Sequence, residues 1–303
     1  MKRRVRCAMA ALLFWICCGM TYAAKMPPAR QKVYRVAMTA AFVSEAGTHI
    51  YQEISDYMGQ RTHLPFEFVN GFSYQTVNDL LLDGHVDLGF ICGLPYVMLR
   101  EQRTPPAVRL LAGPVMKAPR YEGKPQYFSD IIVAKNSPFH SFSDLRGHVY
   151  VFNDELSNSG YNMPRYYMAK HGYTHGFFKR ILRSGSHENS VRMVATGQAD
   201  ASAVDSMVLD YMFAKDSKYA SKVRVIESIG PAPVVPLVIS TKIDEKTYQR
   251  LQDVILNMDK TPEGKKILEE GLLLRFAKVT DADYDKIREF RAFAHRRHFD
   301  TIK

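Results

Sequence analysis

Two kinds of hydrophobic pattern alternate along the chain after residue 32: short apolar runs of strand length, and longer segments whose apolar positions recur every three to four residues. The early short runs, which predict strands, are residues 33–38, 64–69 and 86–91. An amphipathic segment around Val77 and Leu81 separates the last two runs and ends at Gly84. Strands that alternate with helices predict an α/β protein with mainly parallel sheets.

The first amphipathic segment follows residues 33–38. Its apolar residues, spaced to share one face of a helix, are Ile50, Ile54, Tyr57 and Met58. Ser44 is suited to cap the start of this helix, and Gly59 is a residue type at which helices end.

A weak internal repeat suggests two similar lobes. Gly84-His85-Val86-Asp87 precedes one apolar run, and Gly197-Gln198-Ala199-Asp200, 113 positions further on, precedes another. Two apolar segments, 127–133 and 223–239, could carry the chain from one lobe to the other and back. Ligand sites favour the crevice between such lobes, at the carboxyl ends of strands.

These features define the expected domain limits. We place the first lobe at residues 24–128 and 230–275, and the second at 129–229. Residues 276–303 form a C-terminal helix and a basic tail.

The N-terminus has the pattern of a secretory signal peptide. Basic residues from Lys2 to Arg6 precede an apolar run, residues 7–20, and a small-residue exit that predicts cleavage after Ala23. A membrane anchor is the alternative, but the run is too short to span a bilayer. We therefore assign residues 1–23 to the signal and expect a periplasmic protein.

Removal of the signal changes the composition. Cys92 becomes the only cysteine, so no internal disulfide is expected, and the net charge falls from +10 to +6 because four basic residues are lost. Much of the remaining positive charge lies in residues 286–303. We interpret that tail as a solvated helix and expect no nucleic-acid partner, because export removes the protein from nucleic acids.

One short motif suggests ligand binding. Ser157-Asn158-Ser159-Gly160 lies between a strand-like run, residues 148–152, and a helix-like run, residues 161–171. Hydroxyl and amide groups at a helix start, with outward backbone N–H groups and the helix dipole, bind phosphate-like anions. An ordinary capped helix is the alternative.

Further motifs, in order and spacing, resemble those of a known family. They are residues 84–96, Ser157–Gly160 with Pro164 and Tyr166-Tyr167, Gly185-Ser186-His187-Glu188, residues 197–205 and residues 261–266. From Tyr34 to Arg288 the chain resembles periplasmic binding proteins of the phosphate, phosphite and phosphonate class, which serve ABC transporters. The resemblance implies a type II fold with two lobes, each a mixed, mainly parallel sheet flanked by helices. Two crossover strands would join the lobes as a hinge, so that they close over a ligand.

The resemblance also implies a function and partners. The protein would capture a phosphonate, phosphite or phosphate-like oxyanion and deliver it to the membrane permease of an ABC importer. It would be a monomer and not an enzyme, with no cofactor and no bound metal.

The family's ligand-binding positions match residues on both lobes. Ser157, Asn158 and Ser159 would donate to oxyanion oxygens, and Gly160 would permit close approach. His187 would add a second donor, although a lone His at a helix start can also be a capping or surface residue. Tyr74 would reach across from the first lobe, although an aromatic residue there can also pack in the core.

Asp205 matches a family position that faces the cleft. Its carboxyl group would accept a ligand O–H or ammonium group and repel a fully ionised anion such as sulfate. A helix cap or a surface acid is the alternative.

Cys92 follows the run 86–91, at the sheet edge where ligands bind, and a buried free cysteine is usually an apolar filler. A related branch resembles arsenite-binding sensors with a cysteine in this region. A sensor that reports to a membrane histidine kinase is therefore the alternative function. An enzyme using Cys92, His187 and Asp205 is disfavoured, because three residues of these types, far apart in sequence, can be chosen as a candidate triad in almost any protein.

Overall fold

The structure is a computed structural model that describes residues 32–39, 47–215 and 217–303. The expected signal peptide, residues 1–23, and the expected cap Ser44 lie outside these residues. The contacts group residues 32–303 into one unit. Among the described residues, no helix has both the length and the apolar content that a bilayer crossing requires.

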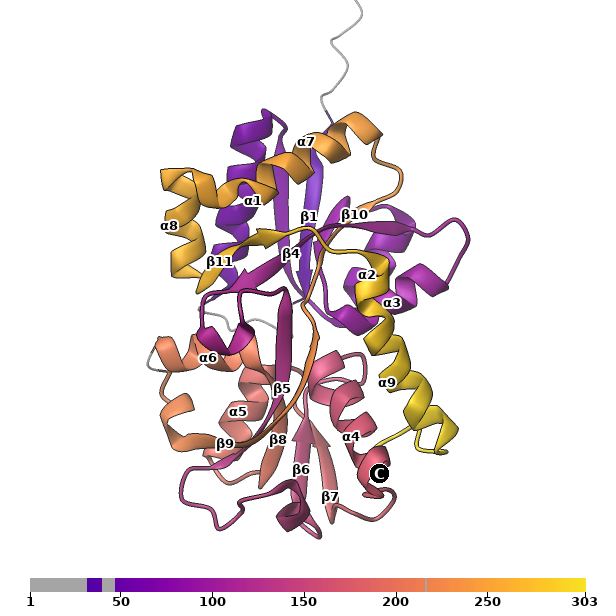
Figure 1. The fold of residues 1–303 in the computed structure, drawn as a ribbon, viewed down its shortest axis with the longest axis vertical. Helices are drawn as coiled ribbons and strands as arrows, with labels where there is room; N and C mark the ends of the chain where they lie inside the picture. The colour runs from indigo at the N-terminus through magenta and orange to yellow at the C-terminus, as the bar shows by residue number, and fades with distance from the viewer. Residues whose placement is uncertain (1–31, 40–46, 216) are drawn as a thin grey trace, which may run out of the picture. The chain divides into compact units, whose positions relative to one another are not determined.

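Six strands form the first sheet, in the order β11-β4-β10-β3-β1-β2. Their bounds are Tyr34–Thr39 (β1), Phe66–Phe72 (β2), Leu88–Phe90 (β3), Val108–Met116 (β4), Leu237–Ser240 (β10) and Leu273–Ala277 (β11). The helices around this sheet are Thr48–Thr62 (α1), Tyr74–Asp83 (α2), Gly93–Glu101 (α3), Glu245–Leu256 (α7) and Pro262–Glu270 (α8). In Figure 1, α1 and α8 lie on the left of this first lobe, α7 runs across its top, and α2 and α3 lie on the right.

Five strands form the second sheet, in the order β7-β6-β8-β5-β9. Their bounds are Gln126–Ala134 (β5), Val149–Phe152 (β6), Arg180–Arg183 (β7), Ala201–Asp205 (β8) and Val223–Pro233 (β9). The helices of this second lobe are Met163–His171 (α4), His187–Ala195 (α5) and Ser206–Ala214 (α6), and a π-helical turn, Asn158–Asn162, leads directly into α4. Short 3₁₀ turns occur at Pro119–Tyr121, Phe142–Leu145, Ala220–Lys222, Met258–Lys260 and Asp281–Tyr284.

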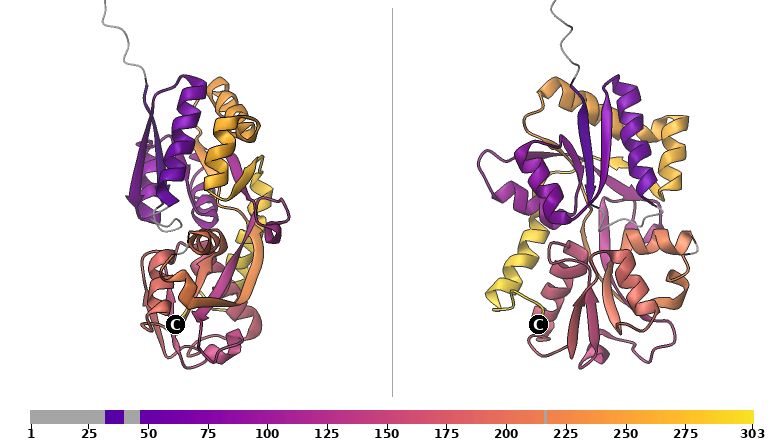
Figure 2. Two further views of the ribbon diagram at one scale, coloured as in Figure 1. Left: turned by 90° about the vertical axis from the view of Figure 1, so that its left-hand side faces the viewer. Right: turned by 180° about the vertical axis from the view of Figure 1, so that it is seen from behind.

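The chain passes between the sheets after β4 and again after β9. It enters the second sheet through β5, and it returns to the first sheet through residues 234–236 and β10. Helix α9, Asp285–Arg296, runs beside both lobes in two views (Figures 1 and 2) and contacts α3 and α4. The proposed lobes were residues 24–128 with 230–275, and residues 129–229. Their limits at 128/129 and 229/230 fall within β5 and β9, close to these passages, and the limit at residue 275 falls within β11.

Both sheets are mixed, which confirms the predicted two-lobed α/β fold, but fewer of the strand pairs are parallel than predicted. The pairs β1–β2, β1–β3, β6–β7 and β6–β8 are parallel. The pairs of β10 with β3 and β4, of β11 with β4, and of β5 with β8 and β9 are antiparallel. The crossover accounts for two of these antiparallel pairs: β4 leaves the first sheet and β10 returns to it, and β5 enters the second sheet and β9 leaves it.

Two local predictions were wrong. Helix α1 continues past Gly59 to Thr62, and His63 takes the left-handed conformation that ends it. Gly59 instead permits close packing, since a Cβ there would lie 3.1 Å from the backbone oxygen of Leu64. The basic tail is not simply solvated: the buried residues of α9 and the segment after it are Ile287, Phe290, Ala294, Phe299 and Ile302.

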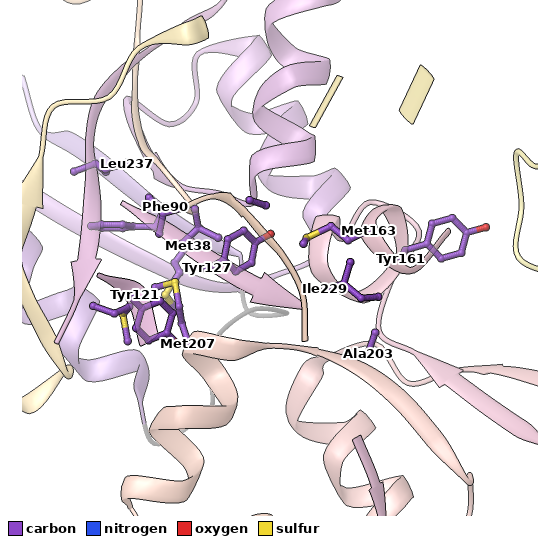
Figure 3. Packing of buried hydrophobic residues seen from close by; sticks show 14 of the residues in the cluster. Met38, Phe90, Tyr121, Tyr127, Tyr161, Met163, Ala203, Met207, Ile229 and Leu237 are labelled. Carbon is purple, nitrogen blue, oxygen red and sulfur yellow. The ribbon is translucent and has the colours of Figure 1, made fainter. Parts of the chain in front are cut away.

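One apolar cluster extends from the first sheet into the second. It contains Met38 and Phe90 from the first sheet, and Tyr127 and Ile229 from the second (Figure 3). Packing of this kind fixes where strand ends lie relative to each other. The carboxyl ends of β6 and β8 and the segment after β3 supply the polar residues of the candidate site.

Candidate functional site

The motif Ser157–Gly160 forms the start of the π-helical turn, and Ser157, Asn158 and Ser159 are fully buried. The helix predicted for residues 161–171 is therefore preceded by a wider turn that begins at Asn158. Ser157 Oγ accepts the Gly160 N–H at 3.0 Å, so the motif caps its own helix as well. We call residues Ser157–Gly160 the anion seat, after the ligand class that the sequence predicts for them.

Gly160 has a steric reason to be glycine. A Cβ built on it would overlap Oδ1 of Asn153, a fully buried residue that directly follows β6. The expected close approach at Gly160 is thus to the protein's own Asn153.

His187 begins α5 and points its ring at the anion seat. Its Nε2 lies 3.4 Å from both Ser157 Oγ and Ser159 Oγ, and its Nδ1 accepts the backbone N–H of Asp205 at 3.4 Å. An accepting Nδ1 assigns the ring hydrogen to Nε2, the atom that faces the two hydroxyl groups. Burial lowers the pKa of His187 to about 3, so the ring is neutral.

Asp205 ends β8, is buried, and accepts hydrogen bonds through both carboxyl oxygens. Its Oδ1 accepts the N–H of Met207 at 2.8 Å, which caps α6, and its Oδ2 accepts from Ser159 Oγ at 3.4 Å. Asp205 therefore caps a helix, as the alternative interpretation predicted, and also contacts the anion seat. Burial is the main cause that raises the pKa of Asp205 to about 7, so protonated and ionised forms coexist near neutral pH.

Tyr74 and Cys92 approach the anion seat from the first lobe. Tyr74 is the first residue of α2, and its Oη accepts from Asn153 Nδ2 at 3.2 Å. Cys92 precedes α3, and its Sγ accepts the Asn158 N–H at 3.3 Å. Burial raises the pKa of the Cys92 thiol to about 11, so the thiol stays protonated.

The structure thus brings all eight predicted residues together: Tyr74, Cys92, Ser157, Asn158, Ser159, Gly160, His187 and Asp205. Sequence reasoning missed others. Asn158 Nδ2 donates to Tyr127 Oη at 2.9 Å, and Ser129 Oγ donates to the Ser159 backbone oxygen at 2.6 Å. Asn153 was also missed, although it shares with Asp205 the signal of a polar residue at the carboxyl end of an apolar strand.

In the described part of the chain, none of these eight residues forms a hydrogen bond with a Lys or Arg side chain. Arg120 pairs with the buried Asp130 at 2.7 Å and with Asp210 at 3.5 Å. Within residues 32–39, 47–215 and 217–303, no cluster of three or more His, Cys, Asp or Glu is placed to hold a metal. The site offers neutral hydrogen-bond groups and one carboxyl group.

This geometry suits binding better than nucleophilic catalysis. In a Ser-His-Asp triad the carboxylate would accept a hydrogen from His Nδ1, and Nε2 would then take the proton of the serine. Here His187 Nδ1 accepts a backbone N–H, and the Asp205 carboxyl group contacts Ser159 instead. His187 therefore presents a hydrogen-bond donor to the anion seat.

Residues 36–284 match the family described as "ABC transporter, phosphonate, periplasmic substrate-binding protein". The chain is 30% identical over 177 residues to the phosphonates-binding periplasmic protein of Escherichia coli K12, a match that covers 57% of this chain and 52% of that protein. It is 27% identical over 217 residues to a probable ABC transporter phosphite-binding protein, PhnD1, of Prochlorococcus marinus, covering 67% and 70%. The chain thus spans about half the length of the first relative.

Solved structures of similar fold cover more of the chain. A binding-protein component of an ABC phosphonate transporter from Pseudomonas aeruginosa has a TM-score of 0.78 and 22% identity, with 88% of both chains covered. The structure of Prochlorococcus PhnD1 in complex with methylphosphonate also has a TM-score of 0.78 and 22% identity, covering 88% of this chain and 99% of that one. The two-lobed fold of type II binding proteins is thereby confirmed.

Proposed function

Because the chain belongs to the family of phosphonate periplasmic substrate-binding proteins of ABC transporters, we propose that it captures a small phosphonate, phosphite or phosphate-like oxyanion and delivers it to a membrane permease. It acts in the periplasm as a monomer and catalyses no reaction. One observation carries this proposal: among the described residues, buried hydrogen-bonding groups of both lobes converge on the anion seat, with no Lys or Arg among their partners.

The chemistry of the seat favours an oxyanion that still carries a hydrogen-bond donor. Ser159 and His187 supply hydroxyl and ring N–H donors that suit oxyanion oxygens. Asp205 supplies an acceptor, which suits a protonated phosphorus oxyanion or an ammonium group on an aminoalkylphosphonate. Sulfate offers no such donor and would meet a carboxylate.

Names of relatives support the same ligand class. One relative is called phosphonates-binding, another is called phosphite-binding, and the structure of the latter contains methylphosphonate. We propose that this chain also binds a phosphorus oxyanion. The titration described next identifies which one.

Isothermal titration of the mature protein tests the proposal. The ligands are phosphate, phosphite, methylphosphonate, aminoethylphosphonate and sulfate. We expect binding of at least one phosphorus oxyanion and weak or no binding of sulfate. Ser159→Ala and His187→Ala should each weaken binding by about 1.5–3 kcal/mol, the value of a hydrogen bond to a charged group.

Matched controls separate the site from general effects. Ser221→Ala and His85→Ala change exposed residues of the same types and should leave affinity unchanged. Wild-type affinity in both Ser159→Ala and His187→Ala would contradict the site. No binding of any phosphorus oxyanion would contradict the ligand class.

Sensing of arsenite is a second candidate, because the Cys92 sulfur lies in the cluster. This function predicts that arsenite binds and that Cys92→Ser abolishes its binding. Transport of a phosphorus oxyanion predicts that Cys92→Ser retains ligand. Titration of the wild type and this variant with arsenite and methylphosphonate distinguishes the two.

A further inference from the structure

Asn153 lies where three parts of the site meet. It directly follows β6 and is fully buried. Its backbone oxygen accepts the Gly185 N–H at 3.0 Å, which holds the turn before His187. Its side-chain oxygen lies against Gly160, and its Nδ2 donates to Tyr74 Oη at 3.2 Å. One residue thus touches both segments of the second lobe that carry ligand donors, and it touches the first lobe.

The amide of Asn153 costs folding free energy. Its Oδ1 has no hydrogen-bond partner among the described residues, although the atom is buried. A buried acceptor without a donor is unfavourable, whereas an apolar side chain of similar size would fill the same space without that cost. Packing alone therefore does not explain an asparagine here, and the hydrogen bond from Nδ2 to Tyr74 is the contact that only a polar side chain supplies.

That hydrogen bond joins the lobes. Tyr74 begins α2 beside the first sheet, and Asn153 directly follows β6 in the second sheet. A contact between rigid lobes exists only while the lobes are closed, so it stabilises the closed state and leaves the open state unchanged.

We propose that Asn153 is a positioning residue that holds the lobes closed through Tyr74 and so slows release of the ligand. The inference rests on the proposed ligand-binding function. Asn153 acts through Tyr74 and the closed arrangement, and it does not contact the ligand. Its effect is therefore the same for ligands of different chemistry, unlike the effect of Asp205.

Stopped-flow kinetics with methylphosphonate and phosphite test the proposal. Asn153→Ala and Tyr74→Phe should each speed ligand release about three- to tenfold, the range that one neutral hydrogen bond gives. The association rate should stay unchanged, because the open state captures the ligand. The double variant should release ligand no faster than the faster single variant, since both remove one bond.

Two variants distinguish loss of the hydrogen bond from a folding defect. Tyr74→Phe removes one oxygen and leaves no void. Asn257→Ala removes the amide of another asparagine, which is hydrogen-bonded to Asp253 at the end of α7, and should leave release unchanged. Additive effects of the two single variants, a slower association, or an effect on only one ligand would each overturn the role of Asn153.

A second measurement separates this inference from the proposed function. Spin labels at Lys246→Cys in the first lobe and Lys179→Cys in the second report the distance between lobes by pulsed electron paramagnetic resonance. Both positions are exposed, and the native Cys92 is only 1% exposed. If no phosphorus oxyanion binds, the proposed function fails, but the spin labels still test whether Asn153 holds the lobes closed. Asn153→Ala should depopulate the closed distance, and an unchanged distance distribution overturns the inference.

Discussion

Replacing Asp205 with Asn tests whether the site selects ligands by their protons. Asp205 is buried, its pKa is raised to about 7 mainly by burial, and its Oδ1 caps α6 by accepting the Met207 N–H at 2.8 Å. Asparagine keeps the shape and this acceptor but cannot ionise. The variant therefore removes the negative charge that Asp205 acquires as the pH rises above 7, and retains the cap.

Sulfate carries no proton near neutral pH, so its affinity shows how large the effect of the Asp205 charge should be. Two negative charges about 4 Å apart repel by about 4 kcal/mol at an effective dielectric constant of about 20, so sulfate should bind only when Asp205 is protonated. With a pKa of about 7, the protonated fraction falls from about 90% at pH 6 to about 10% at pH 8. The dissociation constant of sulfate should rise about tenfold over this range in the wild type and stay constant in Asp205→Asn.

Isothermal titration at pH 6, 7 and 8, at fixed ionic strength and in buffers free of phosphorus and sulfur oxyanions, measures this difference. Asp56→Asn, a change at an exposed carboxyl group of α1, should behave as the wild type. The reasoning is refuted if sulfate affinity of the wild type is flat over this range, or if Asp205→Asn binds no sulfate at any of the three pH values.

Three further predictions concern stability. Gly160→Ala should cost about 1–3 kcal/mol of unfolding free energy, because the new methyl group overlaps Asn153 Oδ1. Arg120→Ala should cost about 3 kcal/mol, because it leaves the carboxylate of Asp130 buried without its cation. The pKa of His187 is about 3 in the folded protein and about 6.5 when unfolded, so at pH 5 this histidine is protonated only in the unfolded chain. The wild type should therefore lose about 2 kcal/mol of unfolding free energy at pH 5, and His187→Gln should not.

Urea unfolding measures all three, each with its own control. Asn153→Ala in the Gly160→Ala background should restore part of the lost stability, and an undiminished loss would argue against the overlap. Arg35→Ala breaks an exposed ion pair with Glu67 and should cost under about 1 kcal/mol; an equal loss in Arg120→Ala would contradict the buried pairing. Parallel pH profiles of the wild type and His187→Gln would disprove the histidine effect.

The sequence predicted what depends on neighbours along the chain. The anion seat was identified because cap residues, a glycine and a helix pattern follow each other within a few positions. Asp205 was identified because it matches a cleft-facing position of the family that the chain resembles. Asn153 and Tyr127 were missed because their roles come from partners 79 and 31 positions away. Antiparallel strands were underestimated for a similar reason: the direction in which β10 returns is decided by the crossover.

The electrostatics of the site follow from burial. Ionised histidine and ionised cysteine would each need a compensating charge at this depth, and the side chains that surround them supply hydroxyl and amide groups. His187 and Cys92 therefore stay neutral, and Asp205 is the one of the three whose charge changes near pH 7. An anion bound here gains hydrogen bonds and little attraction between opposite charges, so its affinity should depend weakly on salt concentration. Selection among oxyanions then depends on where their protons lie.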